Sequence, residues 1–322
     1  MKISIAMATY NGARYLREQL DSFAAQTRKP DELVVCDDGS TDETLRILSD
    51  FADEAPFAVH IYKNEKNLGY AQNFSRALSL CKSELIFLSD QDDFWLSEKI
   101  HEIEQLAMAH PECRLFMNDA ELANGDGTPL GLTKLGQTIS LGLKDVSFTT
   151  GCCMAVKKEF LQLALPVPAG FPAHDTWINR LALLLDAKII IPRVMQHYRR
   201  HGDNASNWLT SRITKQSRMD LVRAYWHKDQ KPQLSRRLKE LLLIEGRLGD
   251  YIKSDDKGGL PPDLIHSALM RIKREHAAVD ERLRFLGQSR FRRWIYVLHF
   301  LTAGDYSYFS GWKSAVKDIV SR

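Results

Sequence analysis

Two aspartates, Asp90 and Asp92, stand one residue apart and directly follow the apolar segment 84–89. In an extended segment, alternate side chains point the same way, so the two carboxylates can converge on one hard cation. Mg²⁺ or Mn²⁺ held by one or two carboxylates is usually completed by phosphate oxygens. The spacing therefore predicts a metal site for a nucleotide diphosphate. The alternative is an acidic run that only caps the helix expected near Ser97.

A second acidic loop, residues 37–42, follows the apolar segment 32–36. Asp42 and Thr44 can start a helix, and Gly39 can turn the chain. Asp37 and Asp38 remain, and their carboxylates are suited to accept hydrogen bonds from a base imide or a ribose hydroxyl. The glycine fingerprints of dinucleotide sites and P-loops are missing from these loops, which argues against bound NAD and against a P-loop NTPase.

Short apolar segments that alternate with helical patterns must position these loops. The expected strands are 2–9, 32–36, 57–62 and 84–89, with helices after each of them. Such alternation predicts an α/β fold with a Rossmann-like, mainly parallel sheet flanked by helices. Ligands of such sheets bind beyond the carboxyl ends of the strands, where each polar loop lies.

The rest of the chain carries weaker signals. We expect a loop or hairpin over 123–136, a helix through Leu163 and a helix after His174, with further strands at 113–118, 152–156, 189–191 and 195–198. From residue 204 onward the leucine spacing predicts helices. Residues 291–301 and 312–320 are basic and amphipathic.

The net charge of +3 combines two opposite parts. Residues 205–322 hold 23 basic and 13 acidic side chains, a balance of +10, which leaves −7 for residues 1–204. This shift predicts a catalytic α/β domain over 1–204 and a basic, helical region over 205–322 that suits an anionic partner.

The cysteines and the N-terminus indicate the compartment. The five cysteines are an odd number without C-x-x-C spacing, as expected for buried or free thiols in a reducing environment. Residues 1–10 lack the long apolar segment and the cleavage site of a secretory signal, and no apolar run reaches about 18 residues, so we expect neither a secretory signal nor a membrane span. We expect a cytoplasmic protein that can associate peripherally with the inner face of a membrane.

Seven motifs occur together in a fixed order. They are ATYNG (8–12), DDGSTD (37–42), NLGYAQN (67–73), SDQDDFW (89–95), TGCCMAV (150–156), HDTW (174–177) and YRRHGDN (198–204). In this order the chain resembles family 2 glycosyltransferases of the GT-A fold, and its D-Q-D-D variant is similar to bacterial rhamnosyltransferase-like enzymes. The resemblance covers about two thirds of the chain and leaves out 205–322.

The resemblance implies a role for each matching residue. Thr9 and Tyr10 would line the nucleotide pocket, Asp38 helped by Asp37 would bind the base or ribose, and Asn67 would lie beside the base. Asp90 and Asp92 would hold Mn²⁺ or Mg²⁺, His201 would touch the metal or the departing diphosphate, and Asp175 would be the catalytic base. The chain departs from the family at Ala8, where proline is usual, and at His174, where glutamate is common.

The resemblance also implies the reaction and the partners. A sugar would pass from a nucleotide-diphosphate donor, dTDP-rhamnose or a UDP-sugar, to a hydroxyl of a cell-surface glycan or lipid-linked acceptor. Direct displacement assisted by one carboxylate would invert the anomeric centre. The C-terminal helices would meet an anionic membrane surface, and no nucleic acid is expected.

Three other functions fit parts of the sequence. In a haloacid-dehalogenase-type phosphatase, Asp90 would be the nucleophile and Asp92 the acid/base, but Asp93 follows and three strands precede. A sugar nucleotidyltransferase would need a glycine-rich, basic first loop. A non-enzymatic membrane-surface adaptor, or a plain helical bundle, would account for the C-terminal region alone.

Overall fold

The computed structural model describes residues 1–202, 208–226, 230–254 and 259–320. The chain forms two compact units, Met1–Trp226 and His227–Arg322. The boundary expected at residue 204 lies outside the described residues. Residues 209–214 belong to the first unit, where Lys134 Nζ donates to Ser211 Oγ at 2.6 Å and Gln137 Nε2 donates to the carbonyl of Thr214 at 2.8 Å.

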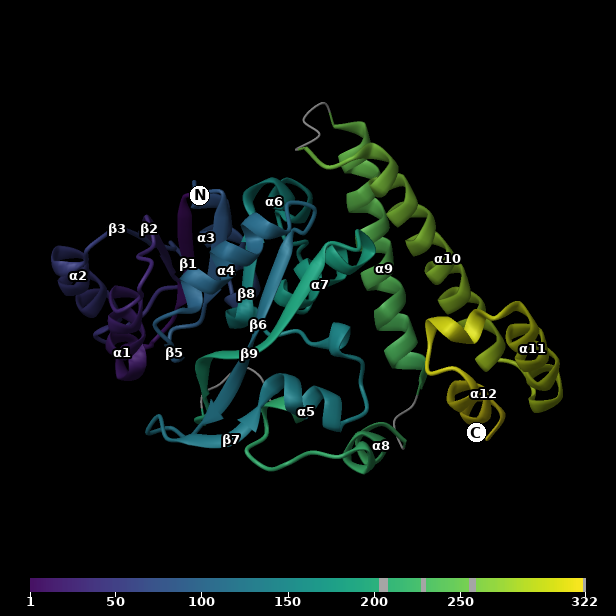
Figure 1. Ribbon diagram of the computed structural model, residues 1–322. Helices are drawn as coiled ribbons and strands as arrows, with labels where there is room; N and C mark the ends of the chain where they lie inside the picture. Colours follow the sequence, from purple (N-terminus) through teal and green to yellow (C-terminus); the bar gives the residue numbers. More distant parts are fainter. Residues whose placement is uncertain (203–207, 227–229, 255–258, 321–322) are drawn as a thin grey trace. The chain divides into compact units, whose positions relative to one another are not determined.

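The first half of the sheet is parallel, as the alternating segments predict. Its strands lie in the order β3 (Ala58–Lys63), β2 (Glu32–Asp37), β1 (Ile3–Thr9) and β4 (Leu85–Ser89). The connecting helices are α1 (Ala13–Ala24), α2 (Thr44–Glu54) and α3 (Tyr70–Leu80) (Figure 1). Strands β2 and β4 are buried along their whole length, as expected where helices cover both faces of a sheet. The predicted α/β fold class is confirmed.

The second half of the sheet mixes directions. It continues from β4 through β8 (Met154–Lys157), β6 (Leu115–Ala123), β9 (Lys188–Arg199) and β5 (Phe94–Trp95), while β7 (Pro129–Thr133) pairs with β6 as a hairpin. The two short strands expected at 189–191 and 195–198 are one strand. Its register with β6 shifts at Pro192, since Ile191 pairs with Asn118 and Val194 with Asp119. Proline has no N–H for the ladder, so the chain bulges there.

Helices of the first unit hold the later loops in place. They are α4 (Lys99–Ala109), α5 (Lys134–Ser140), α6 (Lys158–Ala164), α7 (His174–Leu184) and α8 (Arg218–Trp226). Buried aromatic rings join α1 to β5, with Phe23 and Trp95 at 4.7 Å between centroids. All five cysteines are free and buried, as expected.

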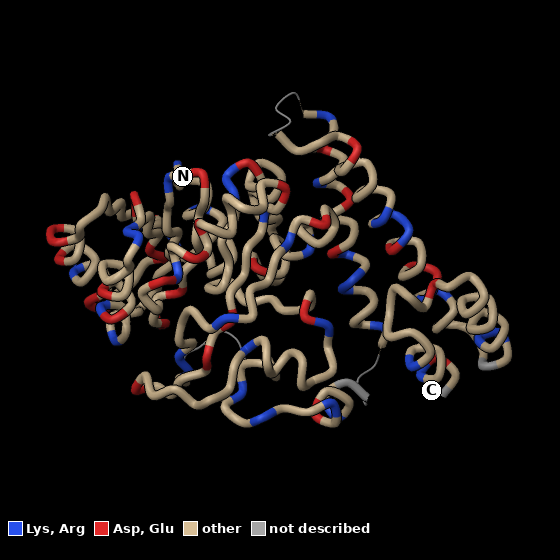
Figure 2. The backbone as a smooth tube through the Cα atoms, viewed as in Figure 1, with Lys and Arg blue, Asp and Glu red and all other residues tan. Residues whose placement is uncertain are grey.

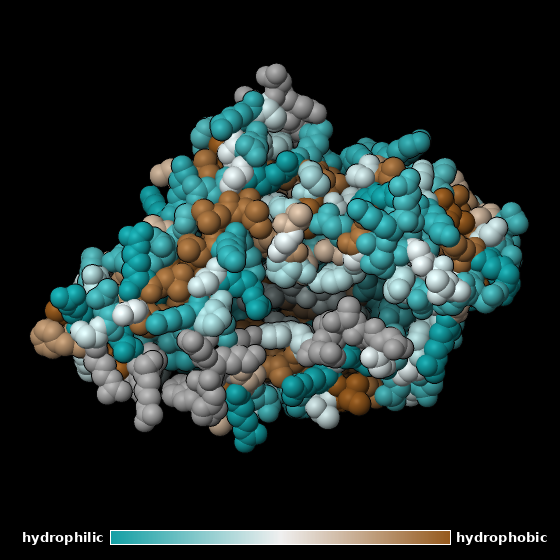
Figure 3. Space-filling view, turned by 180° about the vertical axis from the view of Figure 1, so that it is seen from behind, coloured by the Kyte–Doolittle hydropathy of each residue, from teal (hydrophilic) through white to brown (hydrophobic). Residues whose placement is uncertain are grey.

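On the face seen in Figure 3, hydrophobic residues form patches within a mostly hydrophilic surface.

The second unit is helical, as predicted. It contains α9 (Gln230–Lys253), α10 (Pro262–Leu286), α11 (Arg290–Ala303) and α12 (Trp312–Val320). Helices α9 and α10 run side by side and carry interspersed basic and acidic residues (Figures 1 and 2). A buried ion pair between Arg282 and Asp318, at 2.9 Å, ties α10 to α12. Among the described residues, no helix combines the length and the apolar character that crossing a bilayer requires.

Candidate active site

A cavity of about 440 Å³ lies in the first unit, beyond the carboxyl ends of β1, β2 and β4. Its lining contains most of the residues that the sequence singles out, namely Thr9, Tyr10, Asp38, Asn67, Asp90, Asp92 and Asp175. Five separate segments contribute these side chains, and each segment ends a strand, follows a strand or starts a helix. The sheet therefore gathers at one edge residues that are far apart in sequence.

Asp38 organises the loop before α3. Its Oδ1 accepts hydrogen bonds from Asn64 Nδ2 at 2.7 Å and from the N–H of Leu68 at 2.8 Å, and its Oδ2 accepts from the N–H of Gly69 at 2.9 Å. Asn67 Nδ2 donates to the Asp38 carbonyl at 3.2 Å. Because carboxylate oxygens carry further lone pairs, Asp38 can hold this loop and still accept a ligand hydrogen bond.

Asp37, the last residue of β2, lies outside the cavity lining. Its side chain is fully buried and joins β1 to the acidic loop. Its Oδ2 accepts from Thr9 Oγ1 at 2.8 Å and from Ser40 Oγ at 2.6 Å, and its Oδ1 accepts from the N–H of Ser40 at 2.8 Å. The structure thus gives Asp37 a supporting role beneath Thr9.

Acidic groups crowd the end of β4. Single ligand atoms of Asp90, Asp93 and Cys152 lie within 4.8 Å of one another. Burial raises the pKa of Asp90 well above its usual range, and the negative charges of Asp92, Asp93 and Asp175 add to the effect. Burial, followed by the charge of Asp92, raises the pKa of Asp93 to about 7. A bound divalent cation would relieve this repulsion, and carboxylate oxygens suit Mn²⁺ or Mg²⁺.

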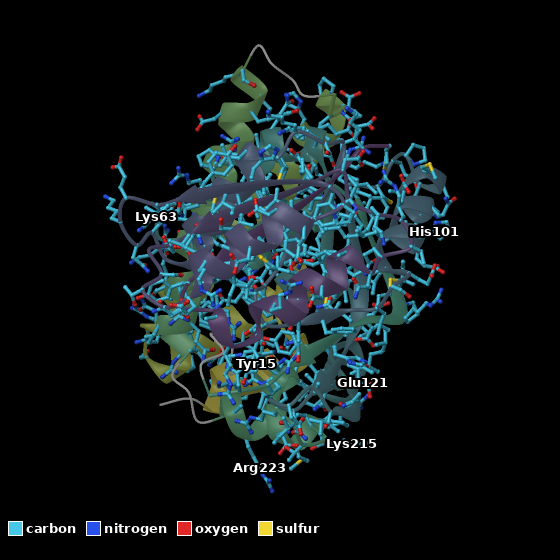
Figure 4. The ribbon with its side chains drawn as sticks, turned by 90° about the vertical axis from the view of Figure 1, so that its left-hand side faces the viewer. Tyr15, Lys63, His101, Glu121, Lys215 and Arg223 are labelled. Atoms are coloured by element: carbon cyan, nitrogen blue, oxygen red, sulfur yellow. The ribbon has the colours of Figure 1, made fainter. Side chains whose placement is uncertain are left out.

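Asp92 contacts the loop that follows β9. Its Oδ2 lies 2.8 Å from His201 Nε2, and Arg199 Nε donates to the Asp92 carbonyl at 3.1 Å. Tyr15 of α1, labelled in Figure 4, stacks near the His201 ring at 4.8 Å between centroids. The chain bends at Gln91 and Asp92, so the alternation expected of an extended segment does not hold there. The structure brings His201 to Asp92 but leaves it outside the cavity lining.

Asp175 stands in the first turn of α7. Trp177 anchors this helix, since its side chain is fully buried and its Nε1 donates to the Ala164 carbonyl at 2.7 Å. Asp175 Oδ1 accepts from the N–H of Thr176 at 2.6 Å. Asp175 also lines a second cavity of about 510 Å³, which includes Trp208 and Thr210 and shares Asp175 with the first. One carboxylate therefore faces two spaces.

Sequence reasoning missed two further residues of this site. Asp93 is the last residue of D-Q-D-D. It could have been recognised only if the bend at Gln91 and Asp92 had been predicted, because the bend breaks the alternation of an extended strand. Lys134 starts α5 and lines both cavities, although the sequence suggests only a loop or hairpin there. Its Nζ lies 4.3 Å from the Tyr198 ring centroid, and burial lowers its pKa. No local signal marks Lys134, because only tertiary packing brings it to the site.

Residues 4–162 match the family model described as glycosyl transferase family 2. The chain contains a family 2 glycosyltransferase domain. It is similar to dTDP-rhamnosyl transferase RfbG of Shigella flexneri, with 26% identity over 256 residues, which are 76% of this chain and 88% of that protein. It is also 34% identical over 131 residues to Rv1520 of Mycobacterium tuberculosis. That match covers 39% of this chain and 37% of Rv1520, so the chain matches little more than a third of that relative's length.

Solved structures share the fold of the domain. S. aureus TarS 1–349 superposes with a TM-score of 0.56 at 18% identity, over 96% of this chain and 89% of that one. The same protein has been solved with UDP and with UDP-GlcNAc. At this level of identity the likeness concerns the fold alone, and it confirms the GT-A architecture that the motifs imply.

Proposed function

We propose that this protein is an inverting, metal-dependent glycosyltransferase that moves a sugar from a nucleotide-diphosphate donor to an acceptor hydroxyl. The observation that carries the proposal is the position of Asp175. It lines one cavity that also contains Asp38, Asp90 and Asp92, and a second cavity next to it. A transfer reaction needs such a group at the boundary between its two substrates.

The first cavity has the groups that a donor requires. Thr9, Tyr10, Asp38 and Asn67 provide hydroxyl, ring and carbonyl contacts for a base and ribose. The residues that would hold Mn²⁺ or Mg²⁺ are Asp90 and Asp93, with Asp92 and His201 beside them. When bound, the cation would neutralise the charge that develops on the leaving diphosphate.

The reaction then needs one base. Asp175 takes the proton of the acceptor hydroxyl as its oxygen bonds to the anomeric carbon, and the bond from that carbon to the diphosphate oxygen breaks. Attack occurs opposite the leaving group, so the anomeric configuration inverts. Besides Asp175, the carboxylates among the described lining residues are Asp38, which holds the loop before α3, and Asp90 and Asp92 at the end of β4.

Donor and acceptor follow from chemistry and from the relatives. The match over 88% of RfbG, a dTDP-rhamnosyl transferase, supports dTDP-rhamnose as the first donor to test, with UDP-sugars next. The second cavity presents Trp208, Thr138 and Thr210. An aromatic ring beside hydroxyl groups suits a sugar ring, which favours a glycan or a lipid-linked glycan as the acceptor.

The exposed face of α11 supports contact with an anionic membrane surface. Five apolar side chains at helical spacing point to solvent, namely Phe291, Trp294, Ile295, Leu298 and Leu301, with Phe291 78% exposed. Arg292 lies between them, and residues 290–304 contain no acidic side chain. Aromatic and apolar residues mixed with basic ones are typical of helices that lie in the lipid interface. We therefore propose that the protein associates peripherally with the inner face of a membrane.

A donor panel tests the proposed function. The purified chain is incubated with MnCl₂ and dTDP-rhamnose, UDP-glucose, UDP-GlcNAc or GDP-mannose, and nucleoside diphosphate release is measured. We expect release from one donor above the rate of a matched Asp175→Asn protein, and loss of release with EDTA. Turnover of sugar phosphates without release from any nucleotide sugar would instead support the phosphatase interpretation and refute the transferase.

A further inference from the structure

His174 is a buried imidazole whose polar atoms have no assigned task. The side chain is 4% exposed, and neither Nδ1 nor Nε2 has a hydrogen-bond partner within the described part of the chain. The ring lines the first cavity beside Asp175. Buried polar groups in folded proteins are almost always hydrogen-bonded, so an imidazole unpaired at both nitrogens at the edge of a cavity indicates a ligand contact.

The surrounding residues hold the ring in one orientation. Phe74 of α3 stacks on it with centroids 4.1 Å apart and an interplanar angle of 23°, and Tyr70 meets it edge-on at 6.0 Å. Gly151 lies next to the ring nitrogen, since a Cβ there would lie only 2.9 Å from Nε2. The glycine thus leaves the space that the ring occupies, and a rotation of the ring would lose the stacking on Phe74.

The ring is neutral under physiological conditions. Burial lowers the pKa of His174 to about 4, although the negative charge of Asp175 acts in the opposite direction. A neutral imidazole has one N–H donor and one acceptor nitrogen, which match the acceptor and donor of a hydroxyl group. His174 does not belong to the group of ligand atoms formed by Asp90, Asp93 and Cys152. A hydroxyl suits it better than a cation or a phosphate.

We propose that His174 hydrogen-bonds a hydroxyl of the donor's sugar and so helps to select which sugar is transferred. This inference rests on the proposed function. We assign His174 to the donor and not to the acceptor because of the cavity it lines. His174 lines the first cavity and is absent from the lining of the second, whereas Asp175 lines both. Thr9, Asp38, Asn67 and His174 all line the first cavity. If Thr9, Asp38 and Asn67 bind the nucleotide as proposed, His174 is left for the sugar.

Two variants of His174 and one control test this role. His174→Phe keeps a stacked ring but has no polar atoms, and His174→Gln keeps a donor and an acceptor. His101→Gln, at the exposed residue labelled in Figure 4, is the matched control. For each protein, kcat and KM are measured with dTDP-rhamnose and with the C4 epimers UDP-glucose and UDP-galactose, and calorimetry gives the Kd of dTDP and of UDP with Mn²⁺.

We expect His174→Phe to lower kcat/KM for the preferred donor by at least about tenfold, the effect of one lost hydrogen bond. The ratio of kcat/KM between the two epimers should change, the Kd of the nucleoside diphosphates should stay within about twofold, and Gln should restore part of the loss. Two results would overturn the proposed role of His174 in binding the sugar. One is a rise in the Kd of UDP or dTDP as large as the fall in kcat/KM, and the other is an unchanged ratio of kcat/KM between the two epimers in both variants. If the wild-type protein releases no diphosphate from any donor, the proposed function fails, and the inference fails with it.

Discussion

The burial of His174 makes a prediction about stability that does not depend on any substrate. In the folded chain its pKa is lowered to about 4 from an ordinary value of 6.5, because a charged imidazole would lose its hydration in this environment. Between these two values the unfolded chain binds more protons than the folded chain. The contribution of His174 to the free energy of unfolding is therefore highest above pH 6.5 and falls as the pH decreases toward 4.

The size of the effect follows from the two pKa values. Integrating the proton linkage gives a loss of about 2.5 kcal/mol on going from about pH 7.5 to about pH 4.5, with a slope near 1.4 kcal/mol per pH unit in the steep region. His174→Gln removes the titrating group. As the pH falls, the wild type should therefore lose this much more unfolding free energy than the variant does.

Urea unfolding at a series of pH values, followed by tryptophan fluorescence, measures this difference. Titrating groups that do not interact with His174 contribute about equally to both proteins, so they cancel when the two curves are subtracted. His101→Gln, at an exposed position, controls for the loss of any histidine. Parallel curves for wild type and His174→Gln between about pH 7.5 and about pH 4.5 would refute the reasoning, because they would mean that the imidazole is charged as easily in the folded chain as in the unfolded one.

Three further predictions concern the reaction and the surface. Asp175→Asn should lower kcat by about 10² to 10⁴ while the donor Kd stays within about twofold, since the amide can still accept from Thr176 but cannot take a proton; near-normal turnover would contradict the assignment. Asp90→Asn should raise the melting temperature of the metal-free protein, because the substitution removes one charge from the crowded group, and it should abolish the change in melting temperature that Mn²⁺ produces. The control Asp126→Asn, at an exposed position, should keep the change produced by Mn²⁺. Equal changes with Mn²⁺ in both variants would contradict the metal site. Replacing Trp294 by serine should reduce co-flotation with vesicles of anionic lipid, which should also weaken at high salt; binding that is equal on neutral vesicles would contradict the charge contribution.

Much of the first half of the fold could be predicted because each unit carries its own local signals. Apolar runs such as 84–89 end at polar loops, and the helices that follow have apolar positions at a period of about 3.6 residues. Parallel order then places the carboxyl ends together, which is why Asp38 and Asp90 lie in one cavity as expected. These predictions needed no knowledge of distant contacts.

The remainder depended on contacts that local patterns do not encode. Asp37 and Asp38 are adjacent, and successive residues at a strand end point to opposite sides, so composition alone could not tell which one faces the ligand. The chain bends at Gln91, and ligand atoms of Asp90, Asp93 and Cys152 lie within 4.8 Å of one another, a grouping that the alternation of an extended segment does not predict. Lys134 reaches the site only because α5 packs on residues 209–214, far along the chain.

The crowding of carboxylates at β4 is itself an argument about function. Burial raises the pKa of Asp90, and the charges of three neighbours, Asp92, Asp93 and Asp175, raise it further. Among the described residues, the buried Lys99 and Lys134 donate to other partners, the Cys152 carbonyl and Ser211. A core selected only for stability would replace such a group by apolar residues. The sheet and α7 hold these charges in place at a cost in stability, as is typical of sites where strain serves binding. Under the proposed function, the free energy released when a cation neutralises Asp90 and Asp93 would help to hold an anionic donor, which is the coupling that a diphosphate leaving group requires.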